Sequence, residues 1–225
     1  MEYKEVIKKL KSLRNPKNIE GMARFGINSA NTLGVSMPVL RDMAKKIGKK
    51  HDLALKLWSS GIHEARILAA LVDEPGKVTG DQMDSWTGDF DSWDVCDQVC
   101  MNLFDKTPFA QKKVFEYSSR KEEFVKRTSF ALMASLAFHH KSMPDDDFKK
   151  FFPLIKKAAT DERNFVRKAV NWGLRQIGKR NLALNNEAIK VAEEIQKIDS
   201  KAARWIANDA IRELKSDAVK KRLDK

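Results

Sequence analysis

Cysteine is scarce in this chain, and its scarcity excludes several kinds of protein. Only Cys96 and Cys100 occur among 225 residues, so a disulfide-stabilised fold is not expected and both thiols suit a reducing cytoplasm. Their spacing places them on one side of a helix, where they could supply two zinc ligands. No second cysteine pair exists, and His139 and His140 are adjacent to each other and distant in sequence. We therefore expect no metal.

Long apolar runs are also absent. No stretch of the chain approaches the roughly 20 apolar residues that a membrane-spanning helix needs. The first residues, MEYKEVIKKLKSL, lack the apolar core of a secretion signal. We therefore expect a cytoplasmic location and no membrane partner.

Negative charge is in deficit. Lys and Arg number 43 against 31 Asp and Glu, which gives a net charge of +12 at pH 7. Such an excess favours a polyanionic partner, with nucleic acid ahead of a membrane surface. The alternative is that many lysines serve only solubility, so charge alone does not decide the partner.

Alternating β-branched segments are scarce, whereas Ala, Leu, Lys and Glu dominate, and this composition favours helices throughout. No low-complexity linker interrupts the chain, so we expect a single domain over residues 1–225. The predicted helices cover residues 3–13, 17–27, 37–48, 51–60, 62–73, 81–88, 91–104, 107–119, 121–140, 145–160, 162–179, 186–198, 200–215 and 217–223.

An internal repeat connects the later helices. The segment Phe124-Val125-Lys126-Arg127 returns as Phe165-Val166-Arg167-Lys168, 41 residues later. A fainter copy follows at an offset of 37, where Arg167, Asn171, Leu174 and Arg175 match Arg204, Asn208, Ile211 and Arg212. Helical repeats of about 40 residues predict an all-α fold, a right-handed α-α superhelix of the HEAT-like or armadillo-like type. Amphipathic helices can also match by chance, but four matched positions in a row favour a true repeat.

Helical periodicity separates a core face from a solvent face in helix 162–179. The apolar stripe comprises Val166, Ala169, Val170, Gly173 and Ile177. Almost opposite lies a stripe of Lys168, Trp172, Arg175 and Lys179. Trp172 therefore stands among cations and away from the residues expected to pack.

Helix 91–104 shows the same division. Its core stripe is Val95, Val99 and Leu103. Trp93 and Asp97 are four residues apart and lie off that stripe, on a flank that Cys100 and Phe104 extend. A helix cap or a favourable interaction with the helix dipole explains Asp91 and also fits Asp94. Asp97 sits in the second turn, which makes it a candidate functional carboxylate.

Repeat equivalence links cations on two helices. In helix 121–140 the core side is Val125, Leu132 and Leu136, and Arg127 points away from it. Arg127 and Lys168 occupy equivalent repeat positions, so they should line one surface. Together with Arg175 and Lys179 they predict a track for phosphate groups. We expect Trp58, Trp86 and Trp205 to be ordinary packing residues.

These residues resemble the AlkD-like DNA alkylation repair proteins over nearly the whole chain. Ser92-Trp93-Asp94-Val95-Cys96-Asp97 is similar to the family's W-D-x-V-D motif, which implies an active-site Trp93 and a catalytic Asp97. The stretch 168–175 resembles K-A-x-x-W-x-L-R and implies a second active-site tryptophan at Trp172. These two motifs and a third, W-x-R-R at residues 124–127, occur in the same order as in the family.

Two further motifs carry the resemblance. Residues 124–127 resemble W-x-R-R, with Phe124 in place of the first aromatic, and imply DNA contacts at Arg127 and at neighbouring Lys126. Residues 33–41 resemble G-[IV]-x-x-P-x-x-R. The family also uses an aromatic residue of an early helix near the lesion, a place that Phe25 could fill.

The resemblance implies a monofunctional glycosylase that hydrolyses the N-glycosidic bond of N3- or N7-alkylated purines. Its partner would be double-stranded DNA containing alkylated bases, which places the protein at the nucleoid, with no cofactor and no obligate protein partner. Its DNA contacts would be Lys126, Arg127, Lys168, Arg175 and Lys179. Two alternatives remain open: a non-catalytic HEAT-like binder of damaged or branched DNA, and a protein-interaction scaffold.

Overall fold

A computed structural model describes residues 1–223, and all regular structure in this range is helical. The helices group into two compact units, residues 1–109 and 110–225. The prediction that they form a single domain stays a prediction. None of the helices described is long and apolar enough to cross a membrane.

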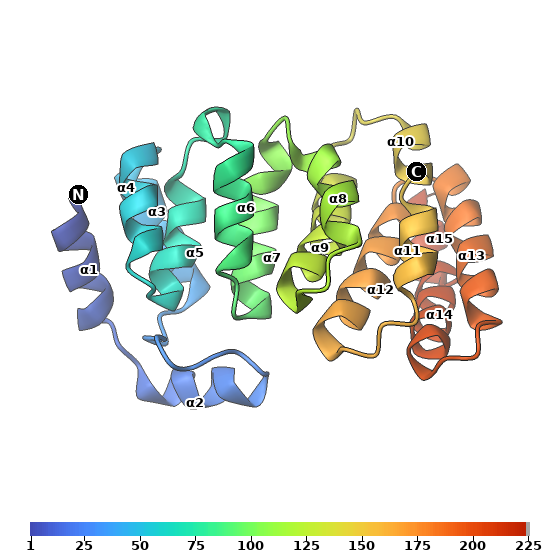
Figure 1. The fold of residues 1–225 in the computed structure, drawn as a ribbon, viewed down its shortest axis with the longest axis horizontal. Coiled ribbons are helices and arrows are strands. Elements are labelled where there is room, and N and C mark those ends of the chain that lie inside the picture. Colours follow the sequence, from blue (N-terminus) through green and yellow to red (C-terminus); the bar gives the residue numbers. More distant parts are fainter. Residues whose placement is uncertain (224–225) are drawn as a thin grey trace. The chain divides into compact units, whose positions relative to one another are not determined.

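The first unit contains seven α-helices and two short 3-10 helices. They are α1 (Tyr3–Ser12), α2 (Pro16–Arg24), α3 (Met37–Ile47), α4 (His51–Ser59), α5 (His63–Val72), η1 (Pro75–Lys77), α6 (Gly80–Gly88), α7 (Trp93–Asn102) and η2 (Phe104–Lys106). Helix α5 packs against α3, α4 and α7. Helix α2 lies across one end of this group rather than within it (Figure 1), and none of its residues is buried.

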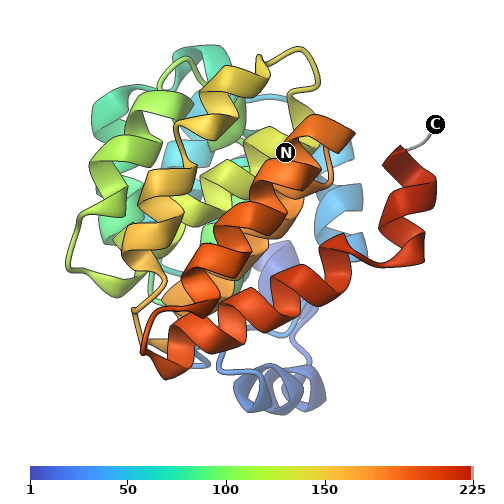
Figure 2. The ribbon, with the colours of Figure 1, turned by 90° about the vertical axis from the view of Figure 1, so that its right-hand side faces the viewer.

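Residues 110–223 of the second unit contain eight α-helices. They are α8 (Ala110–Ser118), α9 (Glu123–His139), α10 (Asp145–Lys149), α11 (Phe152–Ala158), α12 (Asn164–Gly178), α13 (Leu182–Gln196), α14 (Lys201–Leu214) and α15 (Asp217–Leu223). Figure 2 faces this end of the chain and shows α13 and α14 packed side by side, with α15 turning away from α14.

The predicted repeat corresponds to neighbouring helices. Helix α12 packs against both α9 and α14, so the three segments that match in sequence form one layer, the α9–α12–α14 layer. The repeated Phe124 and Phe165 stack with ring centroids 5.7 Å apart. Gly173 allows the close approach of α9 and α12, because a Cβ there would lie 3.2 Å from the Phe130 carbonyl oxygen.

Two predicted helices differ most from the structure. The predicted helix 145–160 is broken into α10 and α11, and Pro153 occupies the first turn of α11, where its missing N–H costs no hydrogen bond. Helix α13 begins at Leu182, four residues earlier than predicted. Asn181 caps it by accepting a hydrogen bond from the Leu184 N–H at 2.9 Å.

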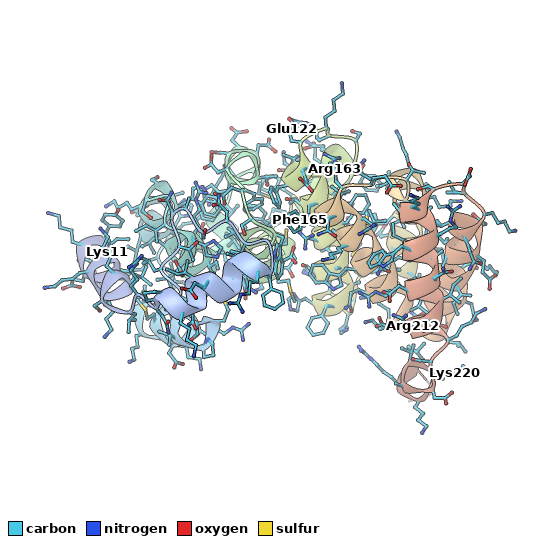
Figure 3. All side chains as sticks on the ribbon, turned by 90° about the horizontal axis from the view of Figure 1, so that it is seen from below. Lys11, Glu122, Arg163, Phe165, Arg212 and Lys220 are labelled. Atoms are coloured by element: carbon cyan, nitrogen blue, oxygen red, sulfur yellow. The ribbon has the colours of Figure 1, made fainter. Side chains whose placement is uncertain are left out.

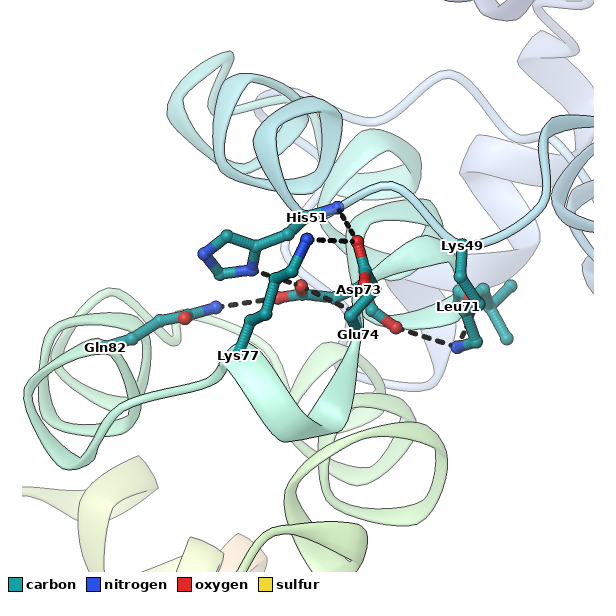
Figure 4. A network of polar contacts seen from close by, with 7 residues as sticks. All are labelled: Lys49, His51, Leu71, Asp73, Glu74, Lys77 and Gln82. Atoms are coloured by element: carbon teal, nitrogen blue, oxygen red, sulfur yellow. Dashed lines mark hydrogen bonds and ion pairs between the residues drawn. The ribbon is translucent and has the colours of Figure 1, made fainter.

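A buried carboxylate joins the central helices of the first unit (Figure 4). Asp73 is completely buried at the end of α5. It pairs with His51 Nδ1 at 2.6 Å and accepts hydrogen bonds from Gln82 Nε2 and the Glu74 N–H, both at 2.7 Å. Lys49 donates from Nζ to the carbonyl oxygen of Asp73 at 2.8 Å. These bonds connect α4, α5 and α6, and they satisfy a group that would be costly to bury alone.

Replacement of this carboxylate should destabilise the first unit. We expect Asp73→Ala to lower the free energy of unfolding by about 2–4 kcal/mol, because three polar partners lose their acceptor. Urea denaturation measures the change. The matched control is Asp52→Ala, which removes an exposed carboxylate from α4. Equal denaturation midpoints for the two variants would contradict this role of Asp73.

Candidate functional site

Trp93 and Asp97 lie in the first two turns of α7, and both are partly exposed. The predicted core stripe is confirmed, because Val95, Val99 and Leu103 are fully buried. The two candidate residues therefore keep access to solvent while the rest of the helix is fixed by packing against α5. This arrangement suits side chains that meet a ligand.

The predicted extension of this flank is wrong. Cys100 and Phe104 are fully buried. The chain leaves α7 after Asn102, and the turn η2 carries Phe104 inward, where its ring lies 6.3 Å from that of Trp86. Burial raises the pKa of the Cys100 thiol well above its usual value, which disfavours the thiolate. Solvent access along this flank therefore ends before Cys100.

A histidine–aspartate pair holds the beginning of α7. Asp94 Oδ2 lies 2.8 Å from His63 Nε2, and Ser92 Oγ donates to Asp94 Oδ1 at 2.7 Å. Burial raises the pKa of Asp94, but the hydrogen bond and charge of His63 outweigh burial and leave that pKa below its usual value. Burial lowers the pKa of His63, but Asp94 reverses this effect and leaves the pKa raised. Asp94 therefore joins α5 to α7.

The segment around α2 meets the same turn of α7. Trp93 donates from Nε1 to the carbonyl oxygen of Phe25 at 3.0 Å, and Asn28 Nδ2 donates to Asp91 Oδ2 at 2.8 Å. Phe25 is 75% exposed, more than any other large apolar residue that the structure describes. The structure thus brings the candidate early aromatic residue beside Trp93. No sequence pattern indicated these two bonds, which join positions more than 60 residues apart.

A buried glutamate fixes the loop that follows α2. The Glu64 carboxylate, 1% exposed, accepts hydrogen bonds from the N–H groups of Leu33, Gly34 and Val35 at 2.5–3.1 Å. Gly34 has φ +78, and a Cβ there would lie 2.3 Å from the Asn15 carbonyl oxygen. The glycine of the predicted G-[IV]-x-x-P-x-x-R element is therefore required by both backbone conformation and space. Sequence reasoning missed Glu64.

In the second unit, Trp172 and Lys168 lie on α12 as predicted. Trp172 is partly exposed, and Lys168 is exposed with no ion-pair partner among the described residues. The predicted core stripe is confirmed, because Val166, Ala169, Val170, Gly173 and Ile177 are buried. Trp93 and Asp97 belong to the first unit and Trp172 to the second, so their convergence on one ligand stays a prediction.

The predicted exposure of Arg127 is wrong. Its side chain is buried, 5% exposed, and Nη1 donates to the carbonyl oxygen of Phe165 at 2.5 Å. The reason is that α9 packs between α8 and α12 and is covered on nearly all sides. Figure 3 shows Phe165 and Arg163 at the start of α12, the place that receives this bond.

Three other predicted DNA contacts form ion pairs within the protein. Lys126 Nζ lies 2.9 Å from Asp161 Oδ2. Arg175 pairs with Glu213, and Lys179 Nζ lies 2.6 Å from the other oxygen of that carboxylate. The carboxylates of Asp161 and Glu213 therefore offset much of the positive charge of these three residues. Each ion pair also links neighbouring helices or the segments that connect them. A DNA-contacting role for these residues stays a prediction and requires the ion pairs to open.

The expectation for the remaining tryptophans holds for two of them. Trp58 and Trp86 are buried and stack with ring centroids 4.0 Å apart. Trp205 differs, because it is 38% exposed on α14 and Arg167 lies over its ring at 4.8 Å. The repeat spacing could have identified it, since Trp205 stands 37 residues after Lys168, the offset of the second repeat.

The stacked helices and the α9–α12–α14 layer define a protein built of HEAT-like helical repeats. A solved structure supports this class: it is described as a new family of proteins related to the HEAT-like repeat DNA glycosylases, with affinity for branched DNA structures. It matches with a TM-score of 0.78 and 17% identity, covering 95% of each chain. The predicted fold class is confirmed.

The family follows from the sequence. A profile of the DNA alkylation repair enzyme family matches residues 6–214, so the chain belongs to that family. The predicted resemblance is confirmed. A designed armadillo repeat protein also matches, at 13% identity over 78% of this chain and 91% of that one, but its TM-score is only 0.35. No curated protein matches this chain.

The His63–Asp94 pair predicts a pH dependence of stability. The raised pKa of His63 means that its contribution is complete below about pH 6.5, its unfolded pKa, and is lost as pH rises through the folded value. The lowered pKa of Asp94 means that its contribution is present above about pH 3.9 and is lost as pH falls. Wild type should therefore exceed His63→Gln in stability most clearly at pH 5–6.

Urea unfolding at pH 5.5, 7 and 8.5 measures this difference. The gap between wild type and His63→Gln should narrow as pH rises. The neutral glutamine keeps a donor for Asp94, so the comparison isolates the charge of His63. A gap of constant size across this range would show that the charge contributes nothing.

Proposed function

We propose that this protein is a DNA glycosylase that releases cationic N3- or N7-alkylated purines from duplex DNA. The observation that carries the proposal is the pair Trp93 and Asp97, partly exposed at the start of α7 and bordered by exposed Phe25. Membership of the DNA alkylation repair enzyme family supports it. The net charge of +12 suits a nucleic acid partner.

The proposed reaction needs little acid catalysis. An N7-alkylated purine is already cationic, so the C1′–N bond breaks with its electron pair moving to the base, which leaves neutral. Positive charge then grows on the deoxyribose. The carboxylate of Asp97 stabilises that charge and orients a water molecule, whose oxygen bonds to C1′ while its proton passes to the carboxylate or to solvent.

The aromatic residues act on the same charge. The π face of Trp93 attracts a cationic nucleotide by about 0.5–2 kcal/mol, and the same role for Trp172 of the second unit stays a prediction from the family resemblance. Exposed Phe25 adds an apolar wall next to Trp93. No metal or organic cofactor enters this chemistry.

Contacts to the DNA backbone start from Lys168, which is exposed and has no partner in residues 1–223. Arg127, Lys126, Arg175 and Lys179 are further proposed contacts. Each of these four would have to exchange an intramolecular bond for a phosphate. Their share of the binding free energy is accordingly smaller than that of a free cation.

A second candidate function is binding of damaged or branched DNA without catalysis. The described affinity of the related solved structure for branched DNA motivates it. This function needs only a basic surface. It predicts salt-dependent binding of DNA and no release of free base from an alkylated duplex.

Asp97→Asn tests the proposal. Incubation with a duplex that contains N7-methylguanine, followed by chromatography, measures the released base. We expect the variant to lose at least about 100-fold in the rate of release, because the stabilising charge is removed. Its affinity for the duplex should stay equal or rise, since one negative charge disappears near the phosphates.

The matched control is Asp52→Asn, which makes the same charge change at an exposed position of α4. It should release base at the wild-type rate. Release by Asp97→Asn at the wild-type rate would remove Asp97 from the mechanism. A wild-type protein that binds the duplex and releases no base would favour the second candidate function.

A further inference from the structure

Ion pairs leave the expected phosphate track of the second unit with few available charges. Lys126, Arg175 and Lys179 have carboxylate partners, and Arg127 is buried. Three exposed or partly exposed cations of the α9–α12–α14 layer have no carboxylate partner among the described residues, and only one of them belongs to that track. They are Arg167 and Lys168 at the start of α12 and Lys201 at the start of α14.

Arg167 is held in place by an aromatic ring. Its guanidinium lies over the indole of Trp205, 4.8 Å from the centroid, and donates from Nη2 to Asn164 Oδ1 at 3.3 Å. Its Nε is buried without a partner in the described part of the chain, so a ligand can be reached only through the Nη groups. A stacked guanidinium has little rotational freedom left to lose when it binds an anion.

The surroundings of this pair are positive. Lys168 follows Arg167 in α12, and Lys201 lies one helical turn before Trp205 in α14; both are exposed. Trp205 occupies the repeat position of Lys168, so the pair belongs to the α9–α12–α14 layer.

The carboxylates nearest to this site in sequence are engaged. Asp199 pairs with Arg204 at 2.9 Å. Glu162 accepts hydrogen bonds from Ser200 Oγ and from the Ala202 N–H, both at 3.2 Å. Asp209, one turn after Trp205, binds the side chains of Asn171 and Arg212. Asp199 and Asp209 are thus paired with Arg204 and Arg212, whereas Glu162, bonded to neutral donors, keeps its negative charge at the start of α14.

We propose that Arg167, ordered by Trp205, binds a phosphodiester group of the DNA strand, with Lys168 and Lys201 contacting the adjacent backbone. This inference rests on the DNA binding of the proposed function and adds a positioning residue, Trp205, and two cations that the sequence analysis did not include. The planar guanidinium matches a phosphate through two parallel N–H donors, and the indole holds it in the required orientation.

The test measures affinity for an undamaged duplex over a range of salt concentrations. Arg167→Ala and Lys168→Ala should each weaken binding and flatten the slope of log affinity against log salt by about one, as expected for one lost phosphate contact. Trp205→Ala should weaken binding about fivefold with a smaller change in slope, because no charge is removed. Trp205→Phe keeps a ring beneath the guanidinium and should restore most of the affinity.

The matched control is Lys215→Ala, which removes the exposed lysine that directly follows α14 and pairs with Glu193 at 2.8 Å. Its slope should stay close to that of wild type. An equal change in slope for Lys215→Ala and Arg167→Ala would reduce the effect to net charge and overturn the site. Wild-type affinity in both Arg167→Ala and Trp205→Ala would also overturn it.

A single-stranded oligonucleotide of the same sequence is the second probe. If Trp205→Ala weakened single-strand binding much more than duplex binding, Trp205 would stack on bases, and its assignment as the support of Arg167 would be wrong. Base release by the wild-type protein is assayed in parallel on alkylated duplex. Duplex binding without release contradicts the glycosylase alone, whereas release with unaffected Arg167 and Trp205 variants contradicts only this site.

Discussion

The candidate site of the first unit depends on one set of hydrogen bonds. The buried carboxylate of Glu64 accepts them from three backbone N–H groups. Burial of a carboxylate is unfavourable unless hydrogen bonds replace its water, and residues 33–35 supply them. This contact fixes the return of the chain from α2 to α3, which in turn sets where Phe25 meets Trp93. The buried Glu64 carboxylate thereby holds Phe25 in place beside Trp93.

Helical periodicity correctly predicted the features of the fold that depend on burial of apolar side chains. The core stripes of α7 and α12 and the stacking of repeated helices follow from spacing alone, since each helix must cover its apolar face. The same reasoning failed where a neighbour covers the polar face as well. Arg127 is buried because α9 has a helix on two sides, and Phe104 turns inward because α7 ends before it.

Charge pattern predicted the surface less well than the core. A stripe of Lys168, Arg175 and Lys179 looks uniformly basic within one helix, but α14 brings Glu213 against two of these residues. Burial raises the pKa of Glu213, yet its two cations outweigh burial and keep that pKa below its usual value. Such ion pairs link one repeat to the next. The sequence of a single helix does not predict them, because the partner lies on another helix. A local motif was enough to predict that Trp93 and Asp97 lie off the core stripe of α7, and their role stays a prediction.

Helix α2 has nine residues and none of them is buried. A helix of that length is marginal in water without packing, so it persists through tethers at its ends, chiefly the Glu64 loop and the bonds to Asp91 and Trp93. With few buried contacts, α2 is expected to open locally at a lower free energy than the core helices of the unit. Phe25, the exposed aromatic residue beside Trp93, is therefore carried by the part of the first unit that has the fewest buried contacts to its core.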